Sequence, residues 1–214
     1  MNLILIAAPA AGKGTLASVL HEKYNLVCIS AGELLRGVDP STELGREIRE
    51  IQSRRELVDD KITNALMKER LMKDDIVNGF ILDGYPRRMA QVEAVNEMCE
   101  ELNLHIDYAI VLNVSYEVAL KRTLGREICP ECKKTYNSLT GVNAPKVDGK
   151  CDKCGGNLYQ RSDDNSESFK VRYDEFIEKT YPLVEYYKKN NALVSIDSVD
   201  PDETIKAIEG VIND

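Results

Sequence analysis

The chain has 214 residues, of which 43% are hydrophobic and 30% are charged, and its formal net charge is −8. This balance is typical of one soluble globular domain with inserted lobes and argues against a disordered chain. The acidic charge argues against a nucleic-acid binder, and no apolar run approaches the roughly 20 residues of a membrane-spanning helix. The apolar opening residues follow no basic segment, so we expect a first strand, no signal peptide and a cytoplasmic protein.

Short apolar runs alternate with helical patterns along most of the chain. The runs predict strands at residues 3–6, 27–29, 80–82, 109–112 and 193–196. The patterns predict helices at residues 15–24, 60–72, 89–102, 116–124, 167–189 and 201–212. This alternation predicts an α/β fold with a five-stranded parallel sheet flanked by helices, which binds ligands at the carboxyl ends of its strands.

Two segments interrupt the alternation. Residues 30–58 are polar and helical in pattern, and residues 127–164 hold four cysteines and many turn residues. We interpret both as mobile lobes inserted into one core, which consists of residues 1–29, 59–126 and 165–214. Within the core, we expect Asp59 and Asp60 to form a solvated helix start. Cys28 and Cys99 are expected to be small buried hydrophobic residues.

The segment that joins the first strand to the first helix, Ala-Ala-Pro-Ala-Ala-Gly-Lys-Gly-Thr, has the context of a phosphate-binding loop. Its backbone N–H groups can cradle phosphate oxygens, Lys13 would bridge the β- and γ-phosphates, and Thr15 would offer its hydroxyl to Mg²⁺. Ala7 and Ala10 stand where glycine is usual, and a positive φ at either would cost about 1 kcal/mol. The alternative is an ordinary turn with an incidental lysine.

Asp83 follows the predicted strand 80–82. A carboxylate at that edge would face the phosphate-binding loop and could hold Mg²⁺ through water. The alternative is a plain Asp-Gly β-turn.

The four cysteines of the second lobe follow the pattern C-x2-C-x18-C-x2-C, formed by Cys129, Cys132, Cys151 and Cys154. Two such pairs are typical of a structural zinc site, because four thiolates satisfy tetrahedral Zn²⁺ and leave no open position. Four free thiols, or a redox pair, are the alternatives.

In this order and spacing, these motifs closely resemble the adenylate kinases over essentially the whole chain. Further matching segments are residues 30–36, 57–58, 79–87, 91, 125–126 and 159–164. The resemblance implies reversible transfer of the terminal phosphoryl group of Mg-ATP to AMP, giving two ADP. It also implies bound Mg²⁺, a structural Zn²⁺ in a lid over ATP, an AMP-binding lobe at residues 30–58 and a monomer.

The resemblance further implies the role of individual residues. The transferred phosphoryl group would be surrounded by Lys13, Arg87, Arg122, Arg126, Arg161 and Arg172. ATP would contact Ala10, Ala11, Gly12, Lys13, Gly14, Thr15, Arg122, Arg126, Thr135, Tyr136 and Val199. AMP would contact Ala31, Arg36, Glu56, Leu57, Val58, Gly84, Tyr85, Pro86, Arg87, Gln91, Arg161 and Arg172, with the Gln91 amide reading the adenine edge.

One position departs from the family pattern. Ala31 stands where threonine is usual, and the missing hydroxyl contact predicts weaker or less selective AMP binding. A kinase for another nucleoside monophosphate therefore remains an alternative, and an ATP-regulated zinc-ribbon binding module is a more distant one.

Overall fold

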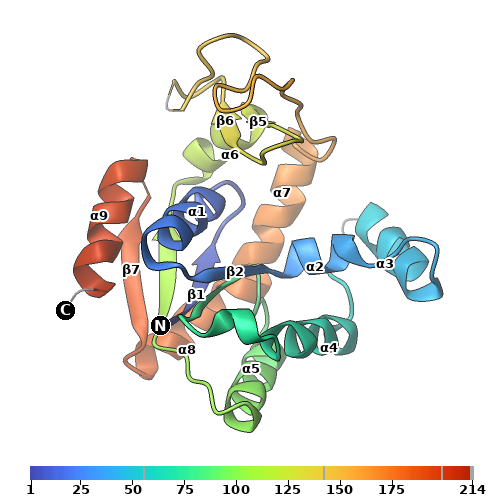
Figure 1. Cartoon of the computed structure of the whole chain (residues 1–214), viewed down its shortest axis with the longest axis vertical. Helices are drawn as coiled ribbons and strands as arrows, with labels where there is room; N and C mark the ends of the chain where they lie inside the picture. The colour runs from blue at the N-terminus through green and yellow to red at the C-terminus, as the bar shows by residue number, and fades with distance from the viewer. Residues whose placement is uncertain (55, 142, 199, 213–214) are drawn as a thin grey trace.

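A computed structural model describes residues 1–54, 56–141, 143–198 and 200–212 (Figure 1). Its centre is a five-stranded parallel sheet in the order β2-β3-β1-β4-β7. The strands are β1 (Asn2–Ala7), β2 (Val27–Ser30), β3 (Phe80–Asp83), β4 (Tyr108–Asn113) and β7 (Leu193–Asp197). The predicted α/β fold and all five predicted strands are confirmed.

Nine α-helices lie within the described residues. They are α1 (Lys13–Tyr24), α2 (Ala31–Gly37), α3 (Glu43–Ser53), α4 (Asp60–Leu71), α5 (Met89–Glu101), α6 (Tyr116–Leu124), α7 (Ser166–Glu175), α8 (Pro182–Lys189) and α9 (Pro201–Ile212). A short 3₁₀ turn covers Asp74–Ile76. Among the described residues, no helix is both long and apolar enough to cross a membrane.

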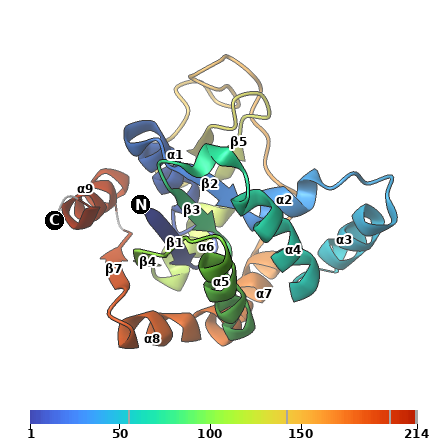
Figure 2. The same ribbon diagram turned by 60° about the horizontal axis from the view of Figure 1, so that its bottom comes forward.

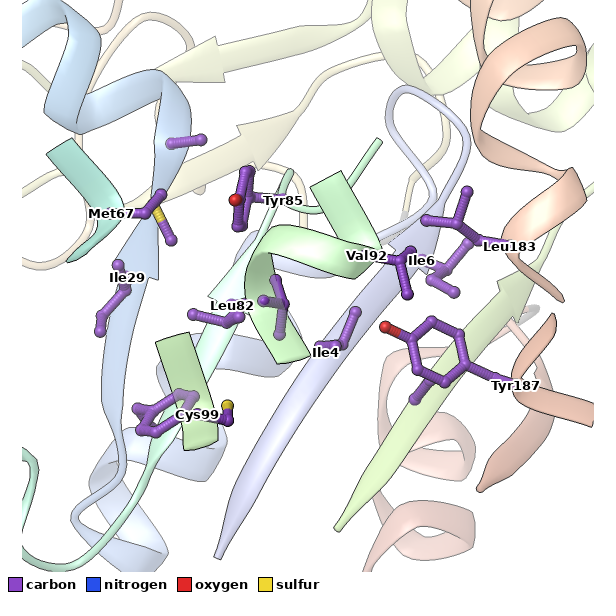
Figure 3. Close-up of a cluster of buried hydrophobic side chains, with 14 of the residues drawn as sticks. Ile4, Ile6, Ile29, Met67, Leu82, Tyr85, Val92, Cys99, Leu183 and Tyr187 are labelled. Carbon is purple, nitrogen blue, oxygen red and sulfur yellow. The ribbon is translucent and has the colours of Figure 1, made fainter. Parts of the chain in front are cut away.

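The sheet separates two layers of helices because alternate side chains of each buried strand point to opposite faces. Ile4 and Ile6 of β1 pack with residues of α4, α5 and α8. Figure 3 shows Tyr187 of α8 beside these two isoleucines and Val92. Leu3 and Leu5 pack on the other face with α1 and α9, and Figure 2 shows α5 and α8 on one side of the strands and α1 on the other.

The register brings several chain segments out at one edge of the sheet. Leu5 pairs with Asp83, and Ser30 of β2 also pairs with Asp83. Three features therefore lie side by side at this end of the sheet. They are the phosphate-binding loop after β1, the start of α2 and the carboxylate that ends β3. This is the edge at which parallel α/β sheets bind ligands.

Two segments extend away from this edge. Helices α2 and α3 project to one side in Figure 1, and the cysteine-bearing lobe lies at the top, where β5 (Arg126–Ile128) pairs antiparallel with β6 (Thr135–Asn137). These are the two segments that interrupt the sequence pattern.

The predicted long helix at residues 167–189 is helical over nearly its whole length but is interrupted. The chain forms α7, a π-helical turn over Phe176–Thr180, and then α8. Tyr181 N donates to Phe176 O at 2.8 Å, a bond to the fifth preceding residue. Pro182 has no N–H and its ring crowds the preceding turn, so the helix widens before it.

Two predictions about buried and exposed side chains are wrong. Cys28 is exposed, because β2 is an edge strand, whereas Cys99 is buried as predicted. Asp59 does begin α4, since its carboxylate accepts from Lys61 N at 2.8 Å. Asp60, however, is not simply solvated: its carboxylate bonds Gln91 and Arg88.

Candidate active site

The phosphate-binding loop turns sharply between β1 and α1. Ala10 and Gly12 have φ angles of 58° and 101°, both in the left-handed region that disfavours side chains. Ala7 lies within β1 and is extended. Of the two alanines that replace glycine, only Ala10 therefore occupies a backbone conformation that glycine would adopt more easily.

Lys13 lies folded back over this loop. Its Nζ donates to Ala7 O at 3.0 Å. Burial lowers the pKa of Lys13, the charge of Asp83 opposes that shift, and the nearby charges of Arg87, Arg126 and Arg172 reinforce it. The charges of three arginines from three other segments thus act on Lys13 together with that of Asp83, and such a concentration of positive charge favours a polyanionic ligand.

Asp83 is suited to a hydrated magnesium ion. Its Oδ1 is buried and has no hydrogen-bond partner among the residues that the structure describes. A buried carboxylate oxygen without a partner is costly unless a ligand or water satisfies it, and Mg²⁺ is commonly held through one or two carboxylates and several waters. Thr15 lies exposed in the first turn of α1.

The segment after β3 is the one predicted to bind the acceptor. Arg87 Nε donates to Gly84 O at 2.9 Å, and burial lowers the pKa of Arg87. A Cβ on Gly84, whose φ is 71°, would lie 2.9 Å from Arg87 Nη2. Thr180 Oγ1 donates to Arg87 O at 3.1 Å. The absence of a side chain at Gly84 therefore lets the Arg87 guanidinium lie close against its own loop.

Gln91 is almost fully buried, with 4% of its surface exposed. Its Oε1 accepts from Arg87 N and its Nε2 donates to Asp60 Oδ1, both at 2.7 Å. The neighbouring Tyr85 is also buried, and its hydroxyl donates to Asn64 Oδ1 at 2.7 Å. Hydrogen bonds thus connect the acceptor loop and its buried amide to the first turns of α4.

The remaining residues predicted to contact AMP differ in environment. Ala31 opens α2 and is buried in the main core, and Val58 packs with Leu35 and Ile48. Glu56 is exposed and pairs with Arg54, so its side chain is directed to that arginine. Leu57 is half-buried, whereas Pro86 is buried.

Arg36 has a positively charged neighbour in the other lobe. It is exposed on α2, and the charges of Arg161 and Asp163 act on it. Arg36 and Arg161 stand in the two segments that were predicted to close over the nucleotides, so an anion between the lobes would offset their repulsion.

Arg126 and Arg172 are joined by two aspartates at the base of the cysteine-bearing lobe. Arg126 Nε donates to Asp164 Oδ2 at 2.8 Å, and a second bond links the same two groups. Arg172 Nη1 donates to Asp163 Oδ2 at 2.8 Å. Because the Asp164 side chain is 0% exposed, these fork-like contacts orient both guanidinium groups with little freedom.

The sequence analysis missed Ser198, which ties the loop after β7 to the phosphate-binding loop. Its Oγ donates to Ala11 O at 2.6 Å, and Arg122 Nη1 donates to the same Oγ at 3.3 Å. No local pattern distinguishes this serine, because its partners lie far away in the sequence. The predicted ATP contact Val199 falls outside the described residues.

The four cysteines converge as predicted. All four Sγ atoms lie within 4.8 Å of one another, with Cys129 and Cys154 at 3.4 Å and Cys132 and Cys151 also at 3.4 Å. A set of four close sulfur ligands suits tetrahedral zinc.

Tyr136, a predicted ATP contact, lies beside the cysteine cluster. It is 1% exposed and packs among the cysteines, where its hydroxyl lies 3.4 Å from Cys151 Sγ and accepts from Asp152 N at 2.7 Å. Its ring therefore supports the cysteine cluster. Thr135, its neighbour in β6, is exposed.

Comparison with known proteins shows the family to which this chain is similar. The family described as Adenylate kinase matches residues 5–192. An adenylate kinase of Thermosipho africanus is 45% identical over 214 residues, covering 99% of this chain and 99% of that protein. An adenylate kinase of Fervidobacterium nodosum is 46% identical over 198 residues, 92% of this chain and 90% of that protein. One from Archaeoglobus fulgidus is 44% identical over 212 residues, 99% and 94% of the two chains.

Similarity at this level over nearly the full length, together with a phosphate-binding loop that faces a cluster of arginines, means that the chain belongs to the adenylate kinase family and transfers a phosphoryl group reversibly between ATP and AMP.

Proposed function

We propose that this transfer takes place at the carboxyl edge of the sheet, between ATP on the phosphate-binding loop and AMP on the loop after β3. The observation that carries the proposal is the position of Lys13 over the phosphate-binding loop, where its Nζ donates to Ala7 O at 3.0 Å and the charges of Asp83, Arg87, Arg126 and Arg172 act on it. In-line phosphoryl transfer depends on positioning and on neutralising the charge of the transferred group. The AMP phosphate oxygen is already ionised at neutral pH, so the site needs no general base.

ATP would lie over residues 10–15, where backbone N–H groups and the amino end of α1 meet its phosphates. Lys13 would leave the carbonyls of Ala7 and Ala8 to bridge the β- and γ-phosphates. Arg122 and Arg126 would contact the same phosphates from the core beside the lid, and Thr135 and Tyr136 of the lid would line the base. Val199 would join them from the β7–α9 connection.

AMP would lie between α2 and the loop after β3. Arg36 and Arg87 would bind its phosphate, since guanidinium groups pair with phosphate oxygens in a fork. Arg161 would reach it from the other lobe and Arg172 from α7 of the core. Its base would lie against Gln91 and Val58. The other predicted neighbours are Ala31, Glu56, Leu57, Gly84, Tyr85 and Pro86.

Two metal ions complete this proposal. Asp83 and Thr15 would hold hydrated Mg²⁺, which neutralises phosphate charge when it is bound with ATP. The four cysteines would hold a structural Zn²⁺, which gives rigidity to a lobe with few apolar residues.

Two lobes would close over the nucleotides, residues 30–58 over AMP and residues 127–164 over ATP. Closure would exclude water and so limit hydrolysis of ATP. All of these residues belong to one chain, so we expect a monomer to be sufficient for activity.

The test compares Lys13→Met with Lys73→Met, an exposed lysine at the opposite edge of the sheet. ADP formation from Mg-ATP is measured with AMP, GMP, UMP and CMP, beside a control with ATP alone. We expect Lys13→Met to lower kcat at least about 100-fold and Lys73→Met to leave it unchanged. A Lys13→Met enzyme with near-normal kcat would refute the proposed phosphate site.

A further inference from the structure

The amide of Gln91 is held at both ends by groups of opposite hydrogen-bonding character. Its Oε1 accepts from the backbone N–H of Arg87 at 2.7 Å, and its Nε2 donates to the carboxylate of Asp60 at 2.7 Å. A backbone N–H can only donate, and an ionised carboxylate can only accept. The amide can therefore satisfy both neighbours in one orientation only.

Turning the amide over would create two mismatches at once. Nε2 would face the N–H of Arg87, and Oε1 would face an oxygen of Asp60. Because Gln91 is 4% exposed, water has little access to these groups to compensate, and buried polar groups without partners are strongly disfavoured. The orientation of this amide is thus determined by its surroundings.

A fixed amide orientation distinguishes between purines. Along the edge of adenine, N6 donates and N1 accepts, whereas O6 accepts and N1–H donates in a 6-oxopurine such as hypoxanthine or guanine. Gln91 retains one N–H on Nε2 and one lone pair on Oε1 for a ligand. Because the amide cannot turn over, its N–H and its lone pair keep fixed positions. They can hydrogen-bond to the edge of one kind of purine, and they place donor against donor and acceptor against acceptor with the other.

Asp60 is well placed to impose this order. It is the first residue of α4 and follows closely on the proposed AMP contact Val58. Its side chain is 26% exposed, and Arg88 Nη1 donates to the same Oδ1 at 3.2 Å. Tyr85 and Asn64 provide a second bond between α4 and the acceptor loop. One oxygen of the carboxylate therefore accepts from both Gln91 and Arg88.

We propose that Asp60 is a specificity-determining positioning residue, whose carboxylate fixes the Gln91 amide and so favours adenine over 6-oxopurine monophosphates. The inference rests on the proposed function of Gln91 as the residue that reads the base.

The experiment measures kcat/KM for AMP and for inosine monophosphate, which differ in the donors and acceptors of that edge alone. In Asp60→Asn, the new side chain can present either an oxygen or an NH2 group to Gln91. The turned-over Gln91 amide then has a partner at residue 60, so only its mismatch with the N–H of Arg87 remains. We expect the AMP preference of this variant to fall about 10-fold, with the KM for ATP unchanged. A role in folding alone would change both substrates and ATP together.

Two control variants separate this effect from charge and helix stability. Asp59→Asn removes the same charge one residue earlier and keeps an oxygen that can cap α4, and Arg88→Gln removes the Arg88–Asp60 pair but leaves the Gln91 bond. Both are expected to keep the AMP preference within about twofold.

Gln91→Ala distinguishes failure of the proposed function from failure of the inference. An unchanged AMP preference in Gln91→Ala would show that Gln91 does not read the base. A reduced preference in Gln91→Ala with an unchanged preference in Asp60→Asn, assayed below its measured Tm, would overturn the role of Asp60 alone.

Discussion

Two alanines in the phosphate-binding loop occupy different backbone conformations. Ala7 is an extended residue of β1, paired with Leu112 of β4, whereas Ala10 has a φ of 58°. An L-residue in the left-handed region is disfavoured by about 1–2 kcal/mol, because its Cβ crowds the following carbonyl. The same substitution to glycine should therefore have opposite effects at these two positions.

We expect Ala10→Gly to raise the free energy of unfolding by about 1 kcal/mol and Ala7→Gly to lower it by about 1 kcal/mol, since glycine weakens a strand interior. Urea denaturation of both variants beside the parent chain measures this. Destabilisation by both substitutions would mean that the loop conformation places no strain on Ala10.

The cysteine-bearing lobe is built from two similar turns. Lys133 N donates to Cys129 O at 3.0 Å, and Gly155 N donates to Cys151 O at 2.8 Å; both donor residues have positive φ angles. Around these turns, the buried apolar side chains among the lobe's described residues are Ile128, Cys129, Tyr136 and Cys151, and Cys132 and Leu158 pack against the cluster of the last three. So small a cluster is insufficient to keep the lobe folded, and a metal would supply the missing stability.

Replacing one cysteine ligand should therefore loosen the lobe before the core. In Cys154→Ser, we expect bound zinc to fall from about one ion per chain to nearly none, and limited proteolysis to cut within residues 127–164 first. Cys28→Ser, at an exposed cysteine outside the cluster, is the matched control. Equal zinc content in the two variants would contradict the site.

The lobe is joined to the rest of the molecule through a buried carboxylate. Asp164 bonds Arg126, at the start of β5, and lies 3.5 Å from Nη2 of Arg172 in α7. Its side chain is 0% exposed, whereas that of Asp163 is 47% exposed. Removing a buried charge leaves its charged partners unpaired and lowers the stability of the fold strongly, whereas an exposed ion pair contributes little to that stability.

The two adjacent aspartates should thus differ in their effect on stability. We expect Asp164→Asn to lower the free energy of unfolding by about 3 kcal/mol, and Asp163→Asn to lower it by less than about 1 kcal/mol. Chemical denaturation of both variants gives the comparison. Equal losses would mean that Arg126 and Arg172 find other partners when Asp164 is gone.

Much of the architecture was predictable because its signals are local. The apolar runs that became β1, β3 and β4 are short, continuous and bounded by turn residues, and such runs indicate buried parallel strands wherever they occur. The phosphate-binding loop and the paired cysteines were also predictable, since each motif lies within a few consecutive residues and its chemistry depends on that spacing.

The tertiary structure was needed wherever the outcome depends on distant residues. The exposure of Cys28 follows from the position of β2 at the edge of the sheet, which its own four residues do not encode. Asp60 and Gln91 are hydrogen-bonded although they are 31 residues apart in the sequence, and Ser198 and Ala11 although they are 187 residues apart. Packing of the helices and loops therefore creates both contacts. Composition and local pattern thus specify which elements form and which chemistry they carry, whereas long-range packing decides which side chains meet, because hydrogen-bond partners are selected by proximity in space.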